Sequence, residues 1–309
     1  MTAASNTAFI TGATGFIGSR LAHRLVNDGW NVHLLTRPTS GKKQIERILH
    51  QVTLHSHDGS TENLIDILAQ TRPTLVFHLA TMFLSAHKPG DIVPLFQSNV
   101  LFSAQLLEAM HRNQINRLIN TGTFSQHYQS RDYSPALLYD TTKRAVDGIV
   151  QFYHEAAKLS VITLELFDSY GPDDPRPKLF ALLKRISESG ETLKMSPGEQ
   201  LIDIVHVDDI VNGYLIAAHR LLASKEEVSE RFALSSGRPI PLKELVAIWQ
   251  RIIGRRVNIE WGGRPYRPRE IMVPWNRGTP LPGWQAVIAL EEGLRRMGAG
   301  PTAEGALPR

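Results

Sequence analysis

The sequence contains no cysteine. Disulfide bonds, a thiolate metal site and a cysteine nucleophile are therefore excluded. Long apolar runs are also missing, because no stretch reaches the ~20 apolar residues that a membrane-spanning helix needs. Residues 1–8 are small and polar, without the charged start and apolar core of a signal peptide. These absences predict a cytoplasmic protein that does not bind membranes.

Concentrated positive charge is missing as well. The formal net charge is +4 over 309 residues, but the basic residues are scattered. No segment alternates them with aromatic residues, as a nucleic-acid-binding stripe would. We therefore expect no nucleic-acid partner, whereas a weakly positive cleft would suit an anionic small molecule. The histidines are dispersed too, with only His55 and His57 closely spaced in a predicted loop, so we expect no bound metal ion.

The first half of the chain alternates short β-branched runs with longer amphipathic segments. Strands that alternate with helices predict βαβ units and a parallel sheet. Right-handed crossovers then give a doubly wound sheet, the Rossmann form of the α/β class. The strands are predicted at 7–11, 31–36, 74–80, 115–121 and 161–167, and the helices at 18–27, 62–70, 91–113 and 139–159.

After residue 167 this rhythm changes. Residues 170–178 are rich in proline and aspartate, and 264–284 are irregular as well. We expect the second half to form mainly a smaller C-terminal substrate-binding lobe whose loops close over the carboxyl edge of the sheet. The expected divisions are a Rossmann domain over 1–167 to which 201–222 returns, a lobe over 168–297 and a disordered tail over 298–309. Within them, short elements are predicted at 201–207 and 231–236, and helices from about 208 and over 241–254.

The segment TGATGFIG, residues 11–18, lies between the first predicted strand and helix. Gly12 permits a tight turn, and Gly15 lets the backbone approach a pyrophosphate. Gly18 lets the helix pack closely on the sheet, while the helix N-terminus faces the phosphates. Because a strand precedes the turn and a helix follows it, the pattern predicts a dinucleotide-binding site.

Two further motifs accompany this turn: HLAT at 78–81 and YDTTK at 139–143. Together with the GxxGxxG spacing, they resemble the extended short-chain dehydrogenase/reductase superfamily, and within it the NAD-dependent epimerase/dehydratase family that acts on nucleotide sugars. The resemblance extends over about residues 7–297. It implies a Rossmann domain with a small C-terminal substrate lobe.

The end of the second predicted strand indicates which dinucleotide binds. NAD-binding Rossmann domains carry an acidic residue there, which holds the ribose 2′-hydroxyl. Here Thr36 takes that place and Arg37 follows. A guanidinium can bind a 2′-phosphate through two hydrogen bonds, so we predict NADP(H). The resemblance also implies that Asp58 lies near the adenine amine. The expected cofactor-binding residues are Gly12, Thr14, Gly15, Phe16, Ile17, Gly18, Arg37, Ser40, Asp58, Gly59, Leu79, Ala80, Thr81, Tyr139 and Lys143.

Tyr139 and Lys143 are four residues apart and share one face of a predicted helix. A free tyrosine has a pKa near ~10, which a neighbouring ammonium group would lower. The resemblance implies that Tyr139 exchanges a proton with the sugar oxygen and that Lys143 also holds the nicotinamide ribose. It further implies a hydroxyl residue at the end of the preceding strand, bonded to the same oxygen. Thr121 is the expected residue, and Thr123 is a second candidate.

The resemblance also narrows the reaction. Dehydratases of the family carry an Asp-Glu pair directly after the catalytic threonine, whereas Gly122 and Thr123 follow Thr121 here. Several stretches, at 120–129, 166–183 and 195–211, resemble 4-ketoreductases of the CDP-abequose synthase type. They imply NADPH-dependent reduction of the 4-keto group of a CDP- or dTDP-linked 4-keto-6-deoxy or 3,6-dideoxy hexose.

A diphosphate substrate calls for cations, and the resemblance places Arg267, in the segment RPRE, near the pyrophosphate. Lys178 is a weaker candidate for the same role. The expected substrate-binding residues are Met82, Thr123, His127, Lys178 and Arg267. The resemblance also implies a homodimer in which helices 91–113 and 139–159 form a four-helix bundle. The apolar residues expected at its interface are Leu95, Phe96, Phe102, Leu106, Val146, Val150 and Phe152.

Three alternatives stay open at this point. The chain could be a nucleotide-sugar 4-epimerase with tightly bound NAD, or a non-catalytic NADP-binding protein. It could also reduce a small free ketone. Intact Thr121, Tyr139 and Lys143 disfavour the non-catalytic alternative, and Arg267 disfavours the small ketone.

Overall fold

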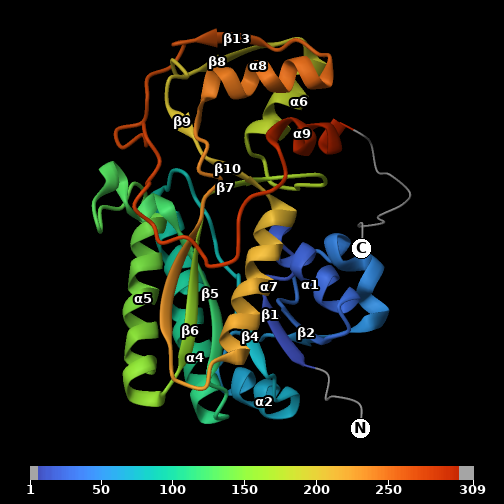
Figure 1. Ribbon diagram of the computed structural model, residues 1–309, viewed down its shortest axis with the longest axis vertical. Coiled ribbons are helices and arrows are strands. Elements are labelled where there is room, and N and C mark those ends of the chain that lie inside the picture. The colour runs from blue at the N-terminus through green and yellow to red at the C-terminus, as the bar shows by residue number, and fades with distance from the viewer. Residues whose placement is uncertain (1–5, 299–309) are drawn as a thin grey trace.

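The computed structural model describes residues 6–298, which form a helix-covered parallel sheet beneath a smaller lobe (Figure 1). The sheet has seven strands in the order β11-β6-β5-β4-β1-β2-β3, and all of its paired strands are parallel. The predicted α/β doubly wound sheet is therefore confirmed. Its strands are β1 (Thr7–Thr11), β2 (Asn31–Thr36), β3 (Val52–Ser56), β4 (Leu75–His78), β5 (Arg117–Thr123), β6 (Ser160–Leu166) and β11 (Ser229–Leu234).

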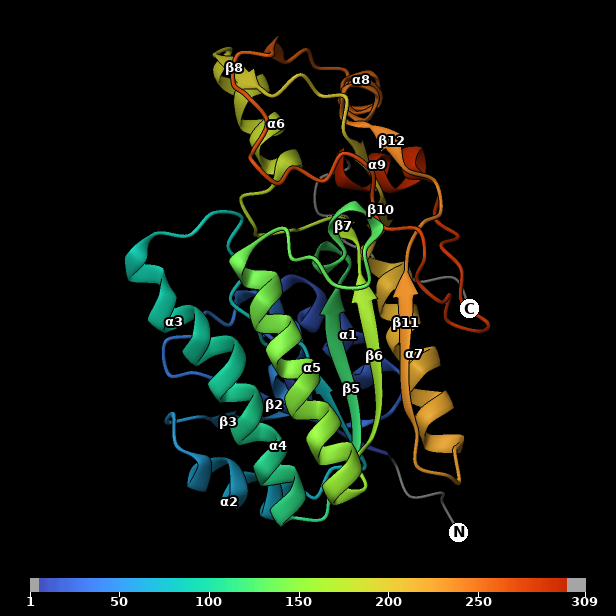
Figure 2. The same cartoon turned by 90° about the vertical axis from the view of Figure 1, so that its left-hand side faces the viewer.

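Helices cover both faces of the sheet, so its strands are apolar on both sides. One core lies beneath α1 (Phe16–Asn27) and α7 (Val207–Ala223). The other lies beneath α2 (Thr61–Thr71), α4 (Phe102–Arg112) and α5 (Leu138–Ala157). Figure 2 shows α4 and α5 side by side in front of the sheet, with α7 behind it.

The helix predicted over 91–113 is divided into several segments. A short turn, η2 (Pro89–Asp91), leads into α3 (Ile92–Phe96), and a π-helical segment, η3 (Gln97–Leu101), then joins α3 to α4. Such π-turns are frequent at functional sites, because they re-aim side chains within a helix. This one carries Asn99, which is buried.

Residues beyond β6 build the lobe around a third apolar core. The lobe's helices and short strands are β7 (Asp168–Tyr170), α6 (Leu179–Ser189), β8 (Thr192–Met195), β9 (Leu201–Ile202), β10 (Ile204–His206), β12 (Ile240–Pro241), α8 (Leu242–Ile253), β13 (Asn258–Trp261) and α9 (Leu290–Gly298). Two 3-10 turns, η4 (Phe124–Gln126) and η5 (Tyr128–Ser130), lie between β5 and α5.

Several elements differ from the sequence-based expectation. The short helix η1 (Lys43–Gln51) and strand β3 were not predicted, nor were α6, β8, β13 and α9. Strand β11 completes the sheet, although it falls within the range 168–297 that we expected to form mainly the lobe. Of the tail expected over 298–309, Gly298 ends α9 and the remainder lies outside the described residues.

The lobe faces the carboxyl ends of the parallel strands, and in Figure 2 the arrowheads of β5, β6 and β11 point toward it. In doubly wound sheets ligands bind at this edge. Within residues 6–298, no helix has the length and apolarity needed to span a membrane.

Candidate functional site

The glycine turn joins β1 to α1 at the carboxyl edge of the sheet. Gly12 has a φ of +74°, and a Cβ there would lie 2.6 Å from the backbone nitrogen of Ala80. A Cβ on Gly18 would clash with the carbonyl group of Gly12. Only glycine therefore allows the turn to fit between α1 and the loop after β4.

The first turn of α1 is open to an anion. Its N-cap, Gly15, is exposed and has no side chain that could accept a hydrogen bond from the first amide groups. The first turn also contains no acidic residue. The amide groups at the start of a helix lack intrahelical acceptors and carry partial positive charge. Thr14 and Ile17, on either side of Gly15 and Phe16, are half-buried. This geometry fits the pyrophosphate of a dinucleotide.

A chain of hydrogen bonds fixes the loop that follows β4. The Ala80 N–H donates to Thr11 Oγ1 (3.2 Å), and Thr11 Oγ1 lies 2.8 Å from His78 Nδ1. On the other side of the ring, His78 Nε2 lies 2.8 Å from Ser103 Oγ, which donates to the Asn99 carbonyl (2.5 Å). Because the Ser103 hydrogen is used there, Nε2 must be the donor and Nδ1 the acceptor. Burial lowers the pKa of His78 to about 3, in agreement with a neutral ring.

The Asn99 side chain continues this support. Its Oδ1 accepts from the Met82 N–H (2.7 Å) and from Thr81 Oγ1 (3.3 Å). Its Nδ2 donates to the Met82 carbonyl (3.0 Å) and to Thr142 Oγ1 on α5 (2.9 Å). Residues 81 and 82 are thus held rigidly beside α5, while Leu79 is bonded through its N–H to the Thr11 carbonyl. Sequence reasoning missed Asn99, although a polar residue in an apolar helical stretch is a usable signal.

At the end of β2, Arg37 is exposed and lies in a tight turn. The Arg37 N–H donates to Ser40 Oγ (3.1 Å), and the Ser40 N–H donates to the Arg37 carbonyl (2.9 Å). Within residues 6–298, no side chain or carbonyl group pairs with the Arg37 guanidinium. Thr36 is buried and donates its hydroxyl hydrogen to the His55 carbonyl (3.2 Å). Thr36, a neutral residue that is already hydrogen-bonded, therefore occupies the position at which NAD-binding domains carry an acidic residue. The exposed guanidinium of Arg37 lies next to it.

Asp58 and Gly59 lie just beyond β3. Oδ1 of Asp58 accepts from the N–H (2.8 Å) and hydroxyl (2.7 Å) of Ser60, the N-cap of α2. These hydrogen bonds lower the pKa of the Asp58 carboxyl. Gly59 has a φ of +100°, and its carbonyl accepts from Gln105 Nε2 (2.9 Å). The turn is well ordered by these contacts.

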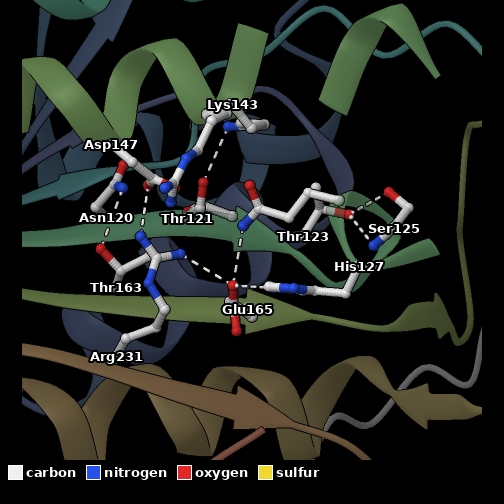
Figure 3. A network of polar contacts seen from close by, with 12 residues as sticks. Asn120, Thr121, Thr123, Ser125, His127, Lys143, Asp147, Thr163, Glu165 and Arg231 are labelled. Atoms are coloured by element: carbon white, nitrogen blue, oxygen red, sulfur yellow. Dashed lines mark hydrogen bonds and ion pairs between the residues drawn. The ribbon is translucent and has the colours of Figure 1, made fainter. Parts of the chain in front are cut away.

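Tyr139 and Lys143 lie in the first turns of α5 and are almost entirely buried, at 7% and 6% exposure. Lys143 Nζ donates to the Thr121 carbonyl (3.0 Å; Figure 3) and lies 5.9 Å from the centre of the Tyr139 ring. Burial raises the pKa of Tyr139, a net shift opposite in direction to the lowering that we expected from the Lys143 charge. Burial also lowers the pKa of Lys143 to about 8, which the negative charge of Asp147 partly opposes.

The structure separates the two candidate threonines. The Thr121 hydroxyl donates to the His78 carbonyl (2.8 Å) and lies 2.7 Å from the Tyr214 hydroxyl on α7. It is thus engaged beneath the helix on the opposite face of the sheet from α5. The Thr123 hydroxyl lies 2.8 Å from Ser125 Oγ, which donates to Oδ1 of Asp140, the residue next to Tyr139. Of the two hydroxyl groups, that of Thr123 is connected to the start of α5.

Phe83 and Lys178 lie beside Tyr139. The Phe83 ring meets the Tyr139 ring edge-on, with 5.0 Å between centres, and Lys178 Nζ lies 5.1 Å from the centre of the Phe83 ring. Lys178 Nζ is also 3.8 Å from Asp168 Oδ1. The hydrogen bond to Glu270, and more weakly the charge of Asp168, raises the pKa of Arg267. Lys178 therefore lies one side chain away from Tyr139, whereas the Arg267 guanidinium donates two hydrogen bonds to Glu270 (both 2.9 Å).

His127 lies in the loop before α5 and has partners on two sides. Its ring stacks on Trp275 with 3.8 Å between centres, and Nε2 lies 3.0 Å from Oε1 of the buried Glu165. The same oxygen accepts from Gln126 (2.9 Å) and Arg231 (2.9 Å; Figure 3). His127 thus anchors the loop before α5 to the sheet and to the lobe, rather than projecting as an unpaired group.

The chain is similar to known proteins over most of its length. A family model described as "NAD dependent epimerase/dehydratase family" matches residues 8–229. CDP-abequose synthase from Salmonella typhimurium is 26% identical over 307 residues, covering 96% of this chain and 99% of that protein. UDP-glucose 4-epimerase from Mycolicibacterium smegmatis is 27% identical, covering 93% of this chain and 96% of that protein.

The fold is shared with solved structures. UDP-glucose 4-epimerase from Brucella ovis in complex with NAD superposes with a TM-score of 0.82 at 19% identity. The match covers 96% of this chain and 98% of that one. The lobe is therefore part of the shared architecture, as well as the sheet.

Proposed function

The chain belongs to the NAD dependent epimerase/dehydratase family, and we propose that it reduces the 4-keto group of a CDP- or dTDP-linked deoxyhexose with NADPH. The observation that carries this proposal is the end of β2, where an engaged threonine and an available Arg37 replace the acidic residue of NAD-binding domains. A dissociable NADPH that is consumed suits a net reduction. The likeness to CDP-abequose synthase supports the same substrate class.

The cofactor's pyrophosphate would lie against the first turn of α1, its 2′-phosphate against Arg37 and its nicotinamide ribose against Lys143. When bound, NADPH supplies the hydride that is added to the carbonyl carbon. Tyr139 donates the proton that the carbonyl oxygen needs, and its raised pKa keeps that proton in place beforehand. The Thr123 hydroxyl would donate to the same oxygen by giving up its bond to Ser125 Oγ. We prefer it to the Thr121 hydroxyl, which is held by both the His78 carbonyl and Tyr214.

Lys178 would bind the diphosphate of the substrate, because it lies over the Phe83 ring that contacts Tyr139. Arg267 would join it by exchanging its ion pair with Glu270 for the diphosphate. The residues after Thr123 are Phe124 and Ser125. Neither can act as the acid and base of a dehydratase, so loss of water is disfavoured whichever threonine is assigned.

Replacing Arg37 with alanine should weaken NADPH binding by about tenfold or more, because a charge-assisted contact to the 2′-phosphate is lost. NADH binding should change little, since NADH lacks that phosphate. Titration of both cofactors into the wild type and the variant measures this directly. Arg47→Ala, which removes another exposed arginine from the neighbouring η1, is the matched control. An equal loss for both cofactors in Arg37→Ala would contradict the assignment.

We also propose a homodimer formed through α3, η3, α4 and α5. The face predicted from the sequence is partly wrong, because Leu95, Leu106, Val146 and Val150 are buried in the protomer's own core. The exposed apolar side chains of these elements are Ile92, Val93, Phe96, Leu101 and Phe152.

Light scattering at micromolar concentration should give twice the mass of the chain. The double variant Leu101→Arg/Phe152→Arg should give the mass of one chain, since both side chains are more than half exposed and their loss should not disturb folding. A monomeric wild type would end this proposal.

A 4-epimerase is the second candidate, and the likeness to the Mycolicibacterium smegmatis enzyme supports it. An epimerase would retain NAD through purification and consume no added NADPH. Analysis of nucleotide released from the denatured protein distinguishes the two candidates. A non-catalytic NADP-binding protein would show neither retained NAD nor turnover.

A further inference from the structure

Phe83 is a large apolar side chain that remains 47% exposed although it contacts the candidate proton donor. Its ring meets Tyr139 edge-on, at an interplanar angle of 77°, and Lys178 lies over it. It does not belong to any of the three apolar cores. About half of the Phe83 side chain is therefore exposed to solvent beside Tyr139, where a ligand could pack against it.

The loop that carries Phe83 is held in place. Asn99, at 2% exposure, binds both the N–H and the carbonyl group of the preceding residue, Met82. Asn99 is itself bonded to Thr142 on the helix that carries Tyr139. The backbone next to Phe83 is therefore tied to the helix that carries Tyr139 before any substrate binds.

In the proposed reaction, the hexose of the substrate would lie against the Phe83 ring. The diphosphate is attached at C1 of the sugar, and the reacting carbonyl at C4 lies on the opposite side of the hexose. If Lys178 binds the phosphate and Tyr139 protonates the carbonyl oxygen, the sugar lies along the Phe83 ring that both residues contact. This step rests on the proposed function.

We propose that Phe83 selects deoxysugars, by packing against the edge of the hexose that lacks a hydroxyl group. A methyl or methylene group gains from contact with the ring. A hydroxyl group at the same place would lose its bond to water and find no acceptor on phenylalanine. Discrimination of this kind is worth about 10- to 100-fold in kcat/KM.

The test compares three substrates with the same nucleotide: a fully hydroxylated 4-ketohexose, its 6-deoxy form and its 3,6-dideoxy form. The wild type should favour a deoxygenated form by about 10- to 100-fold in kcat/KM. A preference that arises at the first removal places the C6 methyl group on Phe83, and one that arises at the second places the C3 methylene group there. The comparison therefore shows whether the C6 methyl group or the C3 methylene group contacts Phe83.

Two variants with the same number and branching of side-chain heavy atoms isolate the chemistry of the side chain. Phe83→Leu should keep the preference, because it stays apolar, whereas Phe83→Asn should reduce it to less than about threefold by offering a hydrogen-bond partner. NADPH titration of both variants checks that the cofactor site is intact. If the wild type turned over all three substrates with equal kcat/KM, or if Phe83→Asn kept the wild-type preference, the inference about Phe83 would be overturned while the proposed function would stand. No NADPH oxidation by the wild type with any of the three would remove the proposed function, and this inference with it.

Discussion

Replacing Tyr139 with phenylalanine is expected to lower kcat for reduction of the 4-keto sugar by about 10²–10⁴-fold, the contribution of a single acid-base group. The variant removes one hydroxyl and keeps the ring, so the edge-on contact with Phe83 and the proximity of Lys143 are preserved. Single-turnover oxidation of bound NADPH with saturating sugar measures the chemical step. NADPH affinity should be unchanged, because the loss concerns proton donation.

The two threonines provide internal comparisons for this result. Thr123→Val should lower the same rate, but less than Tyr139→Phe, because it removes one hydrogen bond to the reacting oxygen. Thr121→Val removes a hydroxyl that is bonded to the His78 carbonyl and Tyr214, so its effect should fall mainly on stability. A wild-type rate in Tyr139→Phe would mean that the proton comes from another group.

Lys143→Met is expected to be damaging in two ways, with kcat lowered by about 10²-fold or more and NADPH bound more weakly. The ammonium group makes Tyr139 a stronger acid during reduction and would also hold the nicotinamide ribose. Methionine keeps the length and apolar stem of the lysine, so the packing of α5 should survive.

The same lysine predicts the pH dependence of the wild type. Burial lowers the pKa of Lys143 from 10.5 to about 8, so the side chain is charged below that pH and neutral above it. Reduction should therefore be fast at neutral pH and decline as the pH rises through about 8, by up to about tenfold per pH unit. The pH profile of kcat in Lys143→Met should lack this decline. A wild-type profile that is flat to pH 10 would contradict a role for the charged lysine.

The sheet and the glycine turn were predictable because each depends on local sequence. Strands such as β1 and β2 are short β-branched runs, and Gly12, Gly15 and Gly18 mark the turn that follows β1. Strand β3 was missed because it follows a 3-10 helix, and because its five residues include only two apolar ones and none that is fully buried. Helix α6 was missed because the proline-rich segment 170–178 directly before it contains no recognisable helix-start signal.

The positions of hydroxyl and aromatic groups around Tyr139 were harder to predict. Thr121 and Thr123 are two residues apart on one strand, and sequence alone does not show where the strand leaves the sheet. The role of Phe83 depends on a loop that is held by Asn99, from another element. The dimer face was partly mistaken because both sides of α5 are apolar, and only packing shows that Val146 and Val150 belong to the protomer's core.

The central claim is most directly tested by following NADPH absorbance with CDP- and dTDP-linked 4-keto-deoxyhexoses. The account predicts oxidation of one NADPH for each sugar converted to the 4-hydroxy product, with NADH at least about tenfold less effective in kcat/KM because it offers Arg37 no phosphate. Interconversion of 4-hydroxy sugars without net NADPH consumption, by protein that retains NAD, would contradict it.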